Sequence, residues 1–229
     1  MSKFFDQNRG NLNLFGRTVN QTFEAFVFAA TSAWYREQGW DVEFVHPRSK
    51  DGLVKPLRLK FSTRGRPGNY THVVCQKDGV SRQIRHQLRV ATSAHQPGNK
   101  RNANVCLDVA IITPFDVSSL GTDNYVENSY LISFAEAKHM AAFAELVANF
   151  IGLVHELQPG RLSRIRIEGF KSKQRQDPAP FLYVSGILYR TAQGIVETIE
   201  QRGYDIDVYS KTKSLSTGMK IEEGDANRD

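Results

Sequence analysis

Two apolar runs in the middle of the chain restrict what it can fold into, because each carries an acidic group where the core of a β-sheet is expected. The first covers residues 105–112 and reads VCLDVAII, and the second covers residues 130–138 and reads YLISFAEAK. Runs of this length and composition are typical of strands. A carboxylate inside such a run has to be paired or to bind a cation, since burying it alone is costly. The two runs therefore predict neighbouring strands that share a charged site.

Asp108 lies in the first run and forms the first part of this site. Strict alternation along a strand would place Cys106, Ala110 and Ile112 on the same face as Asp108, and that face is otherwise small and apolar. A carboxylate among such neighbours binds a cation or, at a strand end, meets water or an arginine. The residue alone leaves both interpretations open.

Glu136 and Lys138 end the second run, and their spacing of two residues places them on one face of a strand. Ile132 and Phe134 precede them on that face, so the face changes from apolar to charged, as it would at the lip of a cleft. An exposed ion pair of little energetic weight is the alternative. Two carboxylates and an ammonium on neighbouring strands would suit a hard divalent cation and a phosphate. A metal-dependent nuclease is therefore the first hypothesis.

A third carboxylate, Glu24, lies in the helix predicted for residues 18–38, where apolar residues recur at helical spacing. Val27 and Phe28 follow Glu24 at i+3 and i+4, so its side chain projects from a mostly buried section of the helix. Either Glu24 favours the helix dipole in the first turns, or it faces the same cleft as Asp108 and completes an acidic cluster.

Helices alternate with apolar strands along the chain, so the sequence predicts an α/β fold with a mixed central sheet flanked by helices. We expect one domain over residues 1–210, with a β-hairpin insertion at 57–103, and a disordered tail at 211–229. The first 17 residues are expected to form an arm or short lead-in. The predicted helices cover residues 18–38, 140–157 and 191–202, and the predicted strands cover 41–46, 57–63, 71–76, 81–92, 105–113, 130–138, 164–167, 181–189 and 205–209.

The formal net charge of +6 favours a polyanionic partner. Basic residues gather in the middle of the chain, where they would position a nucleic-acid backbone rather than read its sequence. No apolar run approaches the length of a membrane-spanning helix, and the N-terminus lacks a secretory apolar segment, so we expect a cytoplasmic protein without a membrane partner. The candidate nucleic-acid-binding residues are Arg82, Arg85, Arg89, Lys100 and Arg101, with Gln83, His86 and Gln87 as weaker candidates.

The acidic strands, the Glu-x-Lys pair and the flanking helices together resemble the PD-(D/E)XK nuclease superfamily. The core of this restriction-endonuclease-like fold runs helix, three strands, helix, strand, and the resemblance covers about residues 18–190. Asp108 matches the metal-binding aspartate of the family, and Glu136 with Lys138 matches its (D/E)-x-K element. Leu107 stands where the family name has a proline.

The resemblance implies a phosphodiesterase that depends on Mg²⁺ or Mn²⁺, in the simplest case an endonuclease of restriction, repair or defence type, with DNA favoured over RNA. Asp108 and Glu136, with the backbone carbonyl of Ala137, would hold the metal ion. Lys138 would orient or deprotonate a water made acidic by the metal ion, and Glu24 would bind a second metal ion or a water on the first. A homodimer, or a partner protein that supplies specificity or ATPase activity, fits the same resemblance.

Two other functions stay open at this point. A non-catalytic nucleic-acid-binding module on the same fold would keep the basic surface and need no metal ion, and its binding would depend steeply on salt. An assembly protein would use the β-rich segment and the amphipathic helix at 140–157 as partner surfaces, although the apolar stripe of that helix is what ordinary core packing needs.

Overall fold

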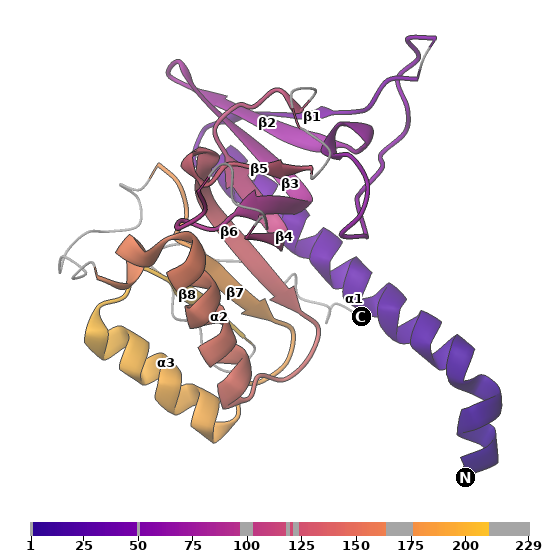
Figure 1. The fold of residues 1–229 in the computed structure, drawn as a ribbon, viewed down its shortest axis with the longest axis vertical. Coiled ribbons are helices and arrows are strands. Elements are labelled where there is room, and N and C mark those ends of the chain that lie inside the picture. Colours follow the sequence, from indigo (N-terminus) through magenta and orange to yellow (C-terminus); the bar gives the residue numbers. More distant parts are fainter. Residues whose placement is uncertain are drawn as a thin grey trace, which may run out of the picture.

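The computed structural model describes residues 2–49, 51–96, 103–117, 120, 124–163 and 176–210, with side chains described from residue 17 onward. A mixed sheet carries helices on both faces (Figure 1), which confirms the predicted α/β class. The helices are α1 (Ser2–Glu37), α2 (Ala144–Leu157) and α3 (Arg190–Arg202). The strands are β1 (Asp41–Val45), β2 (His72–Lys77), β3 (Val80–Ala91), β4 (Asn104–Ile112), β5 (Tyr125–Val126), β6 (Leu131–Lys138), β7 (Phe181–Val184) and β8 (Asp207–Tyr209).

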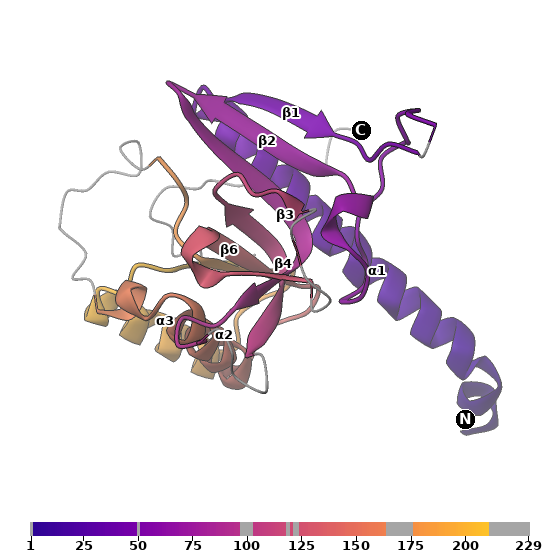
Figure 2. The ribbon, with the colours of Figure 1, turned by 45° about the horizontal axis from the view of Figure 1, so that its top comes forward.

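The strand order in the sheet is β1-β2-β3-β4-β6-β7-β8, and β5 pairs with β3 beside this row. The strands from β1 to β6 in this order pair antiparallel, whereas β6, β7 and β8 pair in parallel. The predicted turn between β2 and β3 is confirmed, because Asp78 and Gly79 have φ values of 50° and 78°, as a two-residue hairpin turn requires. Residues 57–103, expected as an insertion, thus supply two strands that lie inside the sheet (Figure 2).

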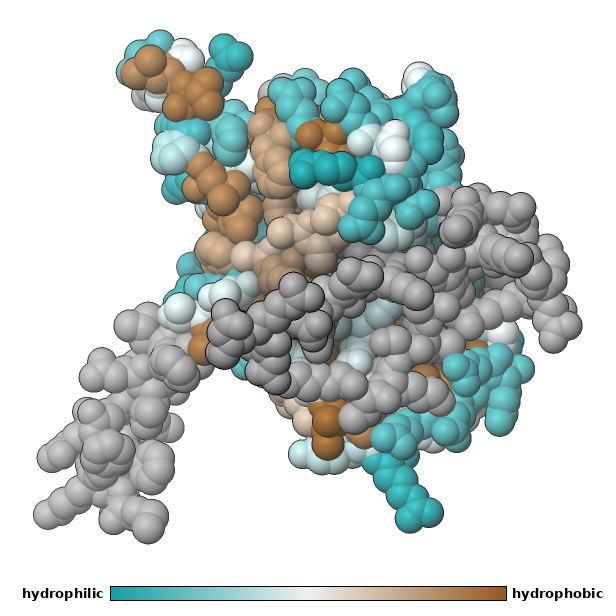
Figure 3. Space-filling model, turned by 180° about the vertical axis from the view of Figure 1, so that it is seen from behind, coloured by the Kyte–Doolittle hydropathy of each residue, from teal (hydrophilic) through white to brown (hydrophobic). Residues whose placement is uncertain are grey.

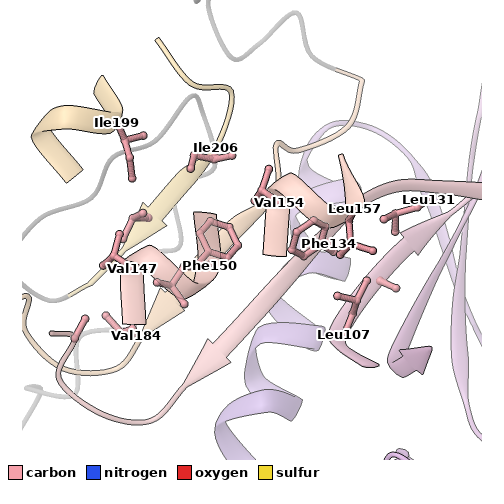
Figure 4. Close-up of a cluster of buried hydrophobic side chains, with 14 of the residues drawn as sticks. Leu107, Leu131, Phe134, Val147, Phe150, Val154, Leu157, Val184, Ile199 and Ile206 are labelled. Atoms are coloured by element: carbon pink, nitrogen blue, oxygen red, sulfur yellow. The ribbon is translucent and has the colours of Figure 1, made fainter. Parts of the chain in front are cut away.

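Each face of the sheet has its own apolar core. On one face, α2 and α3 cover the sheet, and Val147, Phe150, Val154 and Leu157 form the buried stripe of α2. Figure 4 shows these side chains directed at Phe134 of β6 and its neighbours. On the opposite face, α1 covers the middle of the sheet, with core residues Val27, Phe28, Tyr35, Val73, Ile84, Val109, Ile111 and Ala135.

The first helix differs from its prediction at the N-terminal end. It begins at Ser2 rather than Thr18, and its first half projects from the body of the molecule (Figure 1). Residues 2–17 contain no proline, the residue that most strongly interrupts a helix. No helix in the described part of the chain is long and apolar enough to cross a membrane.

Two predicted strands also differ. Residues 57–63 form no strand despite their alternating pattern, because β1 and β3 already occupy both edges of β2. The strand predicted for 181–189 ends at Val184, and only Leu188 continues as an isolated parallel bridge to Ala142. The predicted strand at 164–167 and the tail at 211–229 lie outside the described residues.

Candidate active site

Three neighbouring strands place polar side chains in one row across the sheet. His86 pairs with Val109 and Leu88 pairs with Leu107, so Gln87 of β3 lies opposite Asp108 of β4. The same register, continued by one residue beyond the pair of Val109 and Ala135, places Glu136 of β6 on the other side of Asp108. Asp108 is therefore the centre of the row, and its neighbours along the sheet are an amide and a second carboxylate.

Lys138 joins the two carboxylates. Its Nζ donates to Oδ2 of Asp108 at 2.8 Å and to Oε2 of Glu136 at 2.9 Å. Oδ2 of Asp108 also accepts a hydrogen bond of 3.0 Å from the backbone N–H of Ala137. The structure thus brings together all three residues of the predicted strand site, and it shows Glu136 and Lys138 on one face.

Glu24 reaches this group from α1 through Gln87. Nε2 of Gln87 donates to Oε2 of Glu24 at 2.9 Å and to Oδ1 of Asp108 at 3.0 Å. The helix thus contributes its carboxylate to the same hydrogen-bonded group. Of the two interpretations open for Glu24, the position beside Asp108 is the one that the structure shows.

The backbone at Gln87 makes this arrangement possible. Gln87 has a φ of 52°, which is unusual for a residue other than glycine inside a strand. Before Gln87, Ile84 packs in the core beneath α1, whereas Leu88 and Val90 after it pack in the core beneath α2 and α3. The two faces of β3 thus exchange at the site.

Strand β4 exchanges its faces at the same place. Val109 and Ile111 pack beneath α1, whereas Ala110 and Ile112 pack on the other side of the sheet. Leu107 packs in the same core as Ala110 and Ile112, so strict alternation fails between Leu107 and Val109, on either side of Asp108. Cys106 lies beside the site, where its Sγ donates to Oε1 of Gln87 at 3.3 Å.

Burial shapes the electrostatics of the two strand carboxylates and the lysine. Desolvation, and then the charge of Asp108, raises the pKa of Glu136 from 4.5 to about 7. Burial alone would lower the pKa of Lys138, but the charges of Glu136 and Asp108 outweigh it and raise that pKa above its usual value. Lys138 therefore stays an ammonium at neutral pH, and the ammonium is shared by two carboxylates.

Lys60 and His86 lie next to the site, where Lys60 contacts Gln87 and His86 lies beside Glu24. Lys60 is only 2% exposed, and its Nζ donates to the backbone carbonyl of Gln87 at 2.7 Å. His86 is buried between the rings of Phe28 and Phe61, with Nε2 at 3.5 Å from Oε2 of Glu24. Sequence reasoning missed Lys60 because the residue lies in a segment that looked like a solvated basic strand.

Two of the predicted nucleic-acid-binding residues, Arg82 and Arg85, contact side chains of the protein itself. Arg82 forms a two-pronged ion pair with Asp177, at 2.8 and 2.9 Å. Arg85 is buried and donates to Oε1 of Gln83, and burial lowers its pKa to about 10. Arg85 is buried and Arg82 is paired with a carboxylate, and their predicted role in nucleic-acid binding stays a prediction.

Arg89 donates to the backbone carbonyl of Thr63 and to the side chain of Asn104, and it is only partly buried. Lys100 and Arg101 lie outside the described residues. The expectation that these three residues bind nucleic acid therefore stays a prediction.

The chemistry of the donor set suits a hard divalent cation, because Asp108, Glu136 and the carbonyl of Ala137 offer oxygen atoms. Within the described ranges, however, no three or more histidine, cysteine, aspartate or glutamate residues are grouped so as to hold a metal ion. Lys138 is the cation that the carboxylates contact here. A metal ion at these oxygens would have to displace or share that contact.

No protein-family model and no curated protein matches this chain, so the geometry of the site carries the functional argument.

Proposed function

We propose that the chain is a metal-dependent nuclease with a restriction-endonuclease-like fold, which hydrolyses phosphodiester bonds in DNA. The observation that supports this proposal is the continuous series of hydrogen bonds that links Glu24, Asp108, Glu136 and Lys138, with Gln87 between the first two. These residues come from α1, β4 and β6, far apart in the sequence. The sheet also agrees with the proposed fold, because β4 pairs antiparallel with β6 and β6 pairs in parallel with β7.

Asp108, Glu136 and the backbone carbonyl of Ala137 would hold Mg²⁺ or Mn²⁺, which when bound polarises the scissile phosphate and lowers the pKa of a water. Lys138, with its raised pKa, acts as a cation that orients the attacking water and offsets phosphate charge, rather than as a base. Gln87 holds the carboxylates of Glu24 and Asp108 in fixed orientations. Deprotonated Glu136 is the form that binds the metal ion.

Plasmid cleavage in Mg²⁺ or Mn²⁺ tests the proposal. Asp108→Ala and Lys138→Ala should each abolish cleavage while the cooperative unfolding transition persists, and Glu43→Ala, at an exposed position of the edge strand β1, should cut like the wild type. The proposal fails if the wild type cuts neither DNA nor RNA with either metal ion and the two site variants bind metal like the wild type.

A non-catalytic nucleic-acid-binding module is the second candidate. The contact of Lys138 with both strand carboxylates favours it, because their charge is already partly neutralised without a metal ion. Titration of the protein with Mg²⁺ and Mn²⁺ in a calorimeter separates the two functions. Heat that disappears in Asp108→Ala supports the nuclease, whereas no heat together with salt-sensitive DNA binding supports the module.

A further inference from the structure

The net charge of the chain is concentrated in one short segment. Residues 47–66 contain seven of the 30 lysines and arginines but one of the 24 acidic residues, so their formal charge of +6 equals that of the whole chain. The other residues are balanced, with 23 basic and 23 acidic side chains. We propose that this segment, called here the basic arm, docks the phosphate backbone of duplex DNA beside the candidate active site. The choice of DNA as partner rests on the proposed function.

The basic arm is a built element rather than an undefined loop. It leaves the sheet after β1 and projects beyond it in both ribbon views (Figures 1 and 2). Arg48 and Val54 form an antiparallel bridge, and the N–H of Lys55 donates to the carbonyl of Pro47 at 2.9 Å. Farther along, the N–H of Thr71, next to β2, donates to the carbonyl of Arg58, and the N–H of Arg58 donates to Oγ1 of Thr71. The projecting part therefore has a defined shape and is attached at its base.

The base of the basic arm contacts the strand that supports the site. Lys60 donates to the backbone carbonyl of Gln87, and Arg89 of β3 donates to the carbonyl of Thr63 at 3.2 Å. The ring of Phe61 lies 5.2 Å from that of His86, which is next to Glu24. A duplex bound along the basic arm would thus pass close to the carboxylates.

The cations of the basic arm are available to a partner. Arg48, Arg58, Arg64 and Arg66 are exposed, and none forms an ion pair with a residue that the structure describes, although the guanidinium of Arg58 lies over the ring of Tyr70 at 5.2 Å. Asp51 is the sole acidic residue of the segment. Unpaired cations along a projecting backbone suit a polyanion, since each phosphate contact releases counterions.

Apolar side chains lie among these cations. Leu53, Val54 and Leu57 are 67%, 63% and 60% exposed, and Figure 3 shows hydrophobic residues on the segment that projects at its upper left. Proteins that bind the DNA minor groove combine cations with apolar wedges in this way. The minor groove of duplex DNA is narrow and deep, whereas that of duplex RNA is wide and shallow and offers less contact to an inserted apolar side chain.

Binding of a labelled duplex, measured by fluorescence anisotropy in EDTA at several salt concentrations, tests the docking. The triple variant R48Q/R64Q/R66Q should weaken binding about tenfold or more near 0.1 M salt and reduce the slope of log K against log salt by about 2–3. The control R36Q/R190Q/R202Q removes three exposed arginines from α1 and α3 and should change affinity less than about twofold. The proposal would be overturned if the two triple variants weakened DNA binding equally. It would also be overturned if R48Q/R64Q/R66Q weakened binding of duplex RNA more than binding of duplex DNA.

The apolar tip is tested by a second variant, L53S/V54S/L57S. Weaker DNA binding with an unchanged salt slope supports the docked tip. If the variant instead dissolves a dimer seen by light scattering and binds DNA like the wild type, the tip is an interface between copies and the proposal is wrong.

The two proposals can fail separately. Arm-dependent DNA binding without cleavage in Mg²⁺ or Mn²⁺ would refute the nuclease and leave the docking intact. If the protein cleaves DNA but the substitutions in the basic arm leave its DNA affinity unchanged, the docking proposal is refuted and the nuclease proposal stands.

Discussion

Gln87 shows how one residue can organise a site without carrying charge. Its amide nitrogen donates to Glu24 and to Asp108, and its amide oxygen accepts from Cys106. Its backbone carbonyl is fixed by Lys60. Every polar group of the side chain thus has a partner, so the two carboxylates that accept from it are held in place.

The conformation of Gln87 allows its side chain and backbone to be tested apart. Gln87→Gly removes the amide and tolerates the φ of 52°, whereas Gln87→Ala removes the amide and keeps the strain of a left-handed residue. In urea unfolding, the alanine variant should be less stable than the glycine variant by about 1 kcal/mol. Both variants should cut DNA about 10- to 100-fold more slowly than the wild type, as expected when support of metal ligands is lost. Equal stability of the two variants would contradict the strained backbone.

Glu136 makes stability depend on pH. Its pKa is about 7 in the folded protein against 4.5 ordinarily, because of burial and the charge of Asp108. The folded state holds this proton more tightly than the unfolded chain, so the contribution of Glu136 is fully present below about pH 4.5 and is lost as the pH rises through about 7.

Glu136→Gln cannot lose this proton and should flatten the profile. Between about pH 5 and pH 8, the wild type should lose about 2–3 kcal/mol of unfolding free energy relative to this variant, measured by denaturant titration. Parallel profiles for the two proteins would show that Glu136 titrates normally.

At the scale of elements, sequence patterns predicted the structure best where one face is buried without interruption. The apolar stripe of α2 and the two acidic runs that became β4 and β6 were predicted as elements, although β4 has an irregular register with β6 at Ile111 and Ile112. The site was predicted in part. The sequence indicated that Asp108 lies on one strand and that Glu136 and Lys138 lie on a neighbouring strand, with their side chains close together.

The remaining features depend on tertiary contacts. A positive φ is usually predicted from a glycine, but the residue with a φ of 52° here is Gln87. This conformation reverses which residues of β3 face each core. Residues 57–63 alternate like a strand, yet both sides of β2, the next strand along the chain, are already paired with β1 and β3. Lys60 looked like a surface cation, and its burial follows only from the contact with Gln87.

Gly186 determines how the segments after β6 and β7 fit together. A Cβ at this position would lie 2.7 Å from the backbone nitrogen of Ala141 and 2.8 Å from its Cα. The N–H groups of Met140 and Ser185 both donate to the carbonyl of Lys138, so this junction also fixes the end of the candidate catalytic strand.

Gly186→Ala should therefore lower the free energy of unfolding by about 1–3 kcal/mol, because backbone atoms have to move apart. It should also slow cleavage, since the carbonyl of Lys138 is part of the junction. Gly194→Ala is the matched control: nothing lies within 4 Å of its Cβ in α3, and removal of a helical glycine should stabilise by about 0.5–1 kcal/mol. Thermal unfolding of both variants gives the comparison, and a Gly186→Ala protein as stable as the wild type would refute the close packing.

At the scale of the whole molecule, each face of the sheet has an apolar core, and the polar row lies between the two cores. The core beneath α2 and α3 is the larger one, whereas α1 contributes Glu24, which contacts Gln87 and His86. Glu24 stays beside Gln87 only if α1 keeps its position against the sheet, on both sides of the row of Gln87, Asp108 and Glu136. Asp177, before β7, supplies one such connection, because it accepts from Tyr35 of α1 at 2.7 Å and pairs with Arg82 of β3.

Asp177 should consequently contribute to global stability more than its position in a connecting segment indicates. Asp177→Ala leaves a partly buried guanidinium without its carboxylate and should cost about 2–4 kcal/mol in urea unfolding, whereas Tyr35→Phe loses one hydrogen bond and should cost about 1 kcal/mol. The double variant R82A/D177A should cost less than the sum of its single variants, because neither charge is then left alone. Additive losses would mean that the two residues stabilise the protein independently. In that case α1, β3 and the segment before β7 would not be coupled through this ion pair, and the site beneath α1 would depend on apolar packing alone.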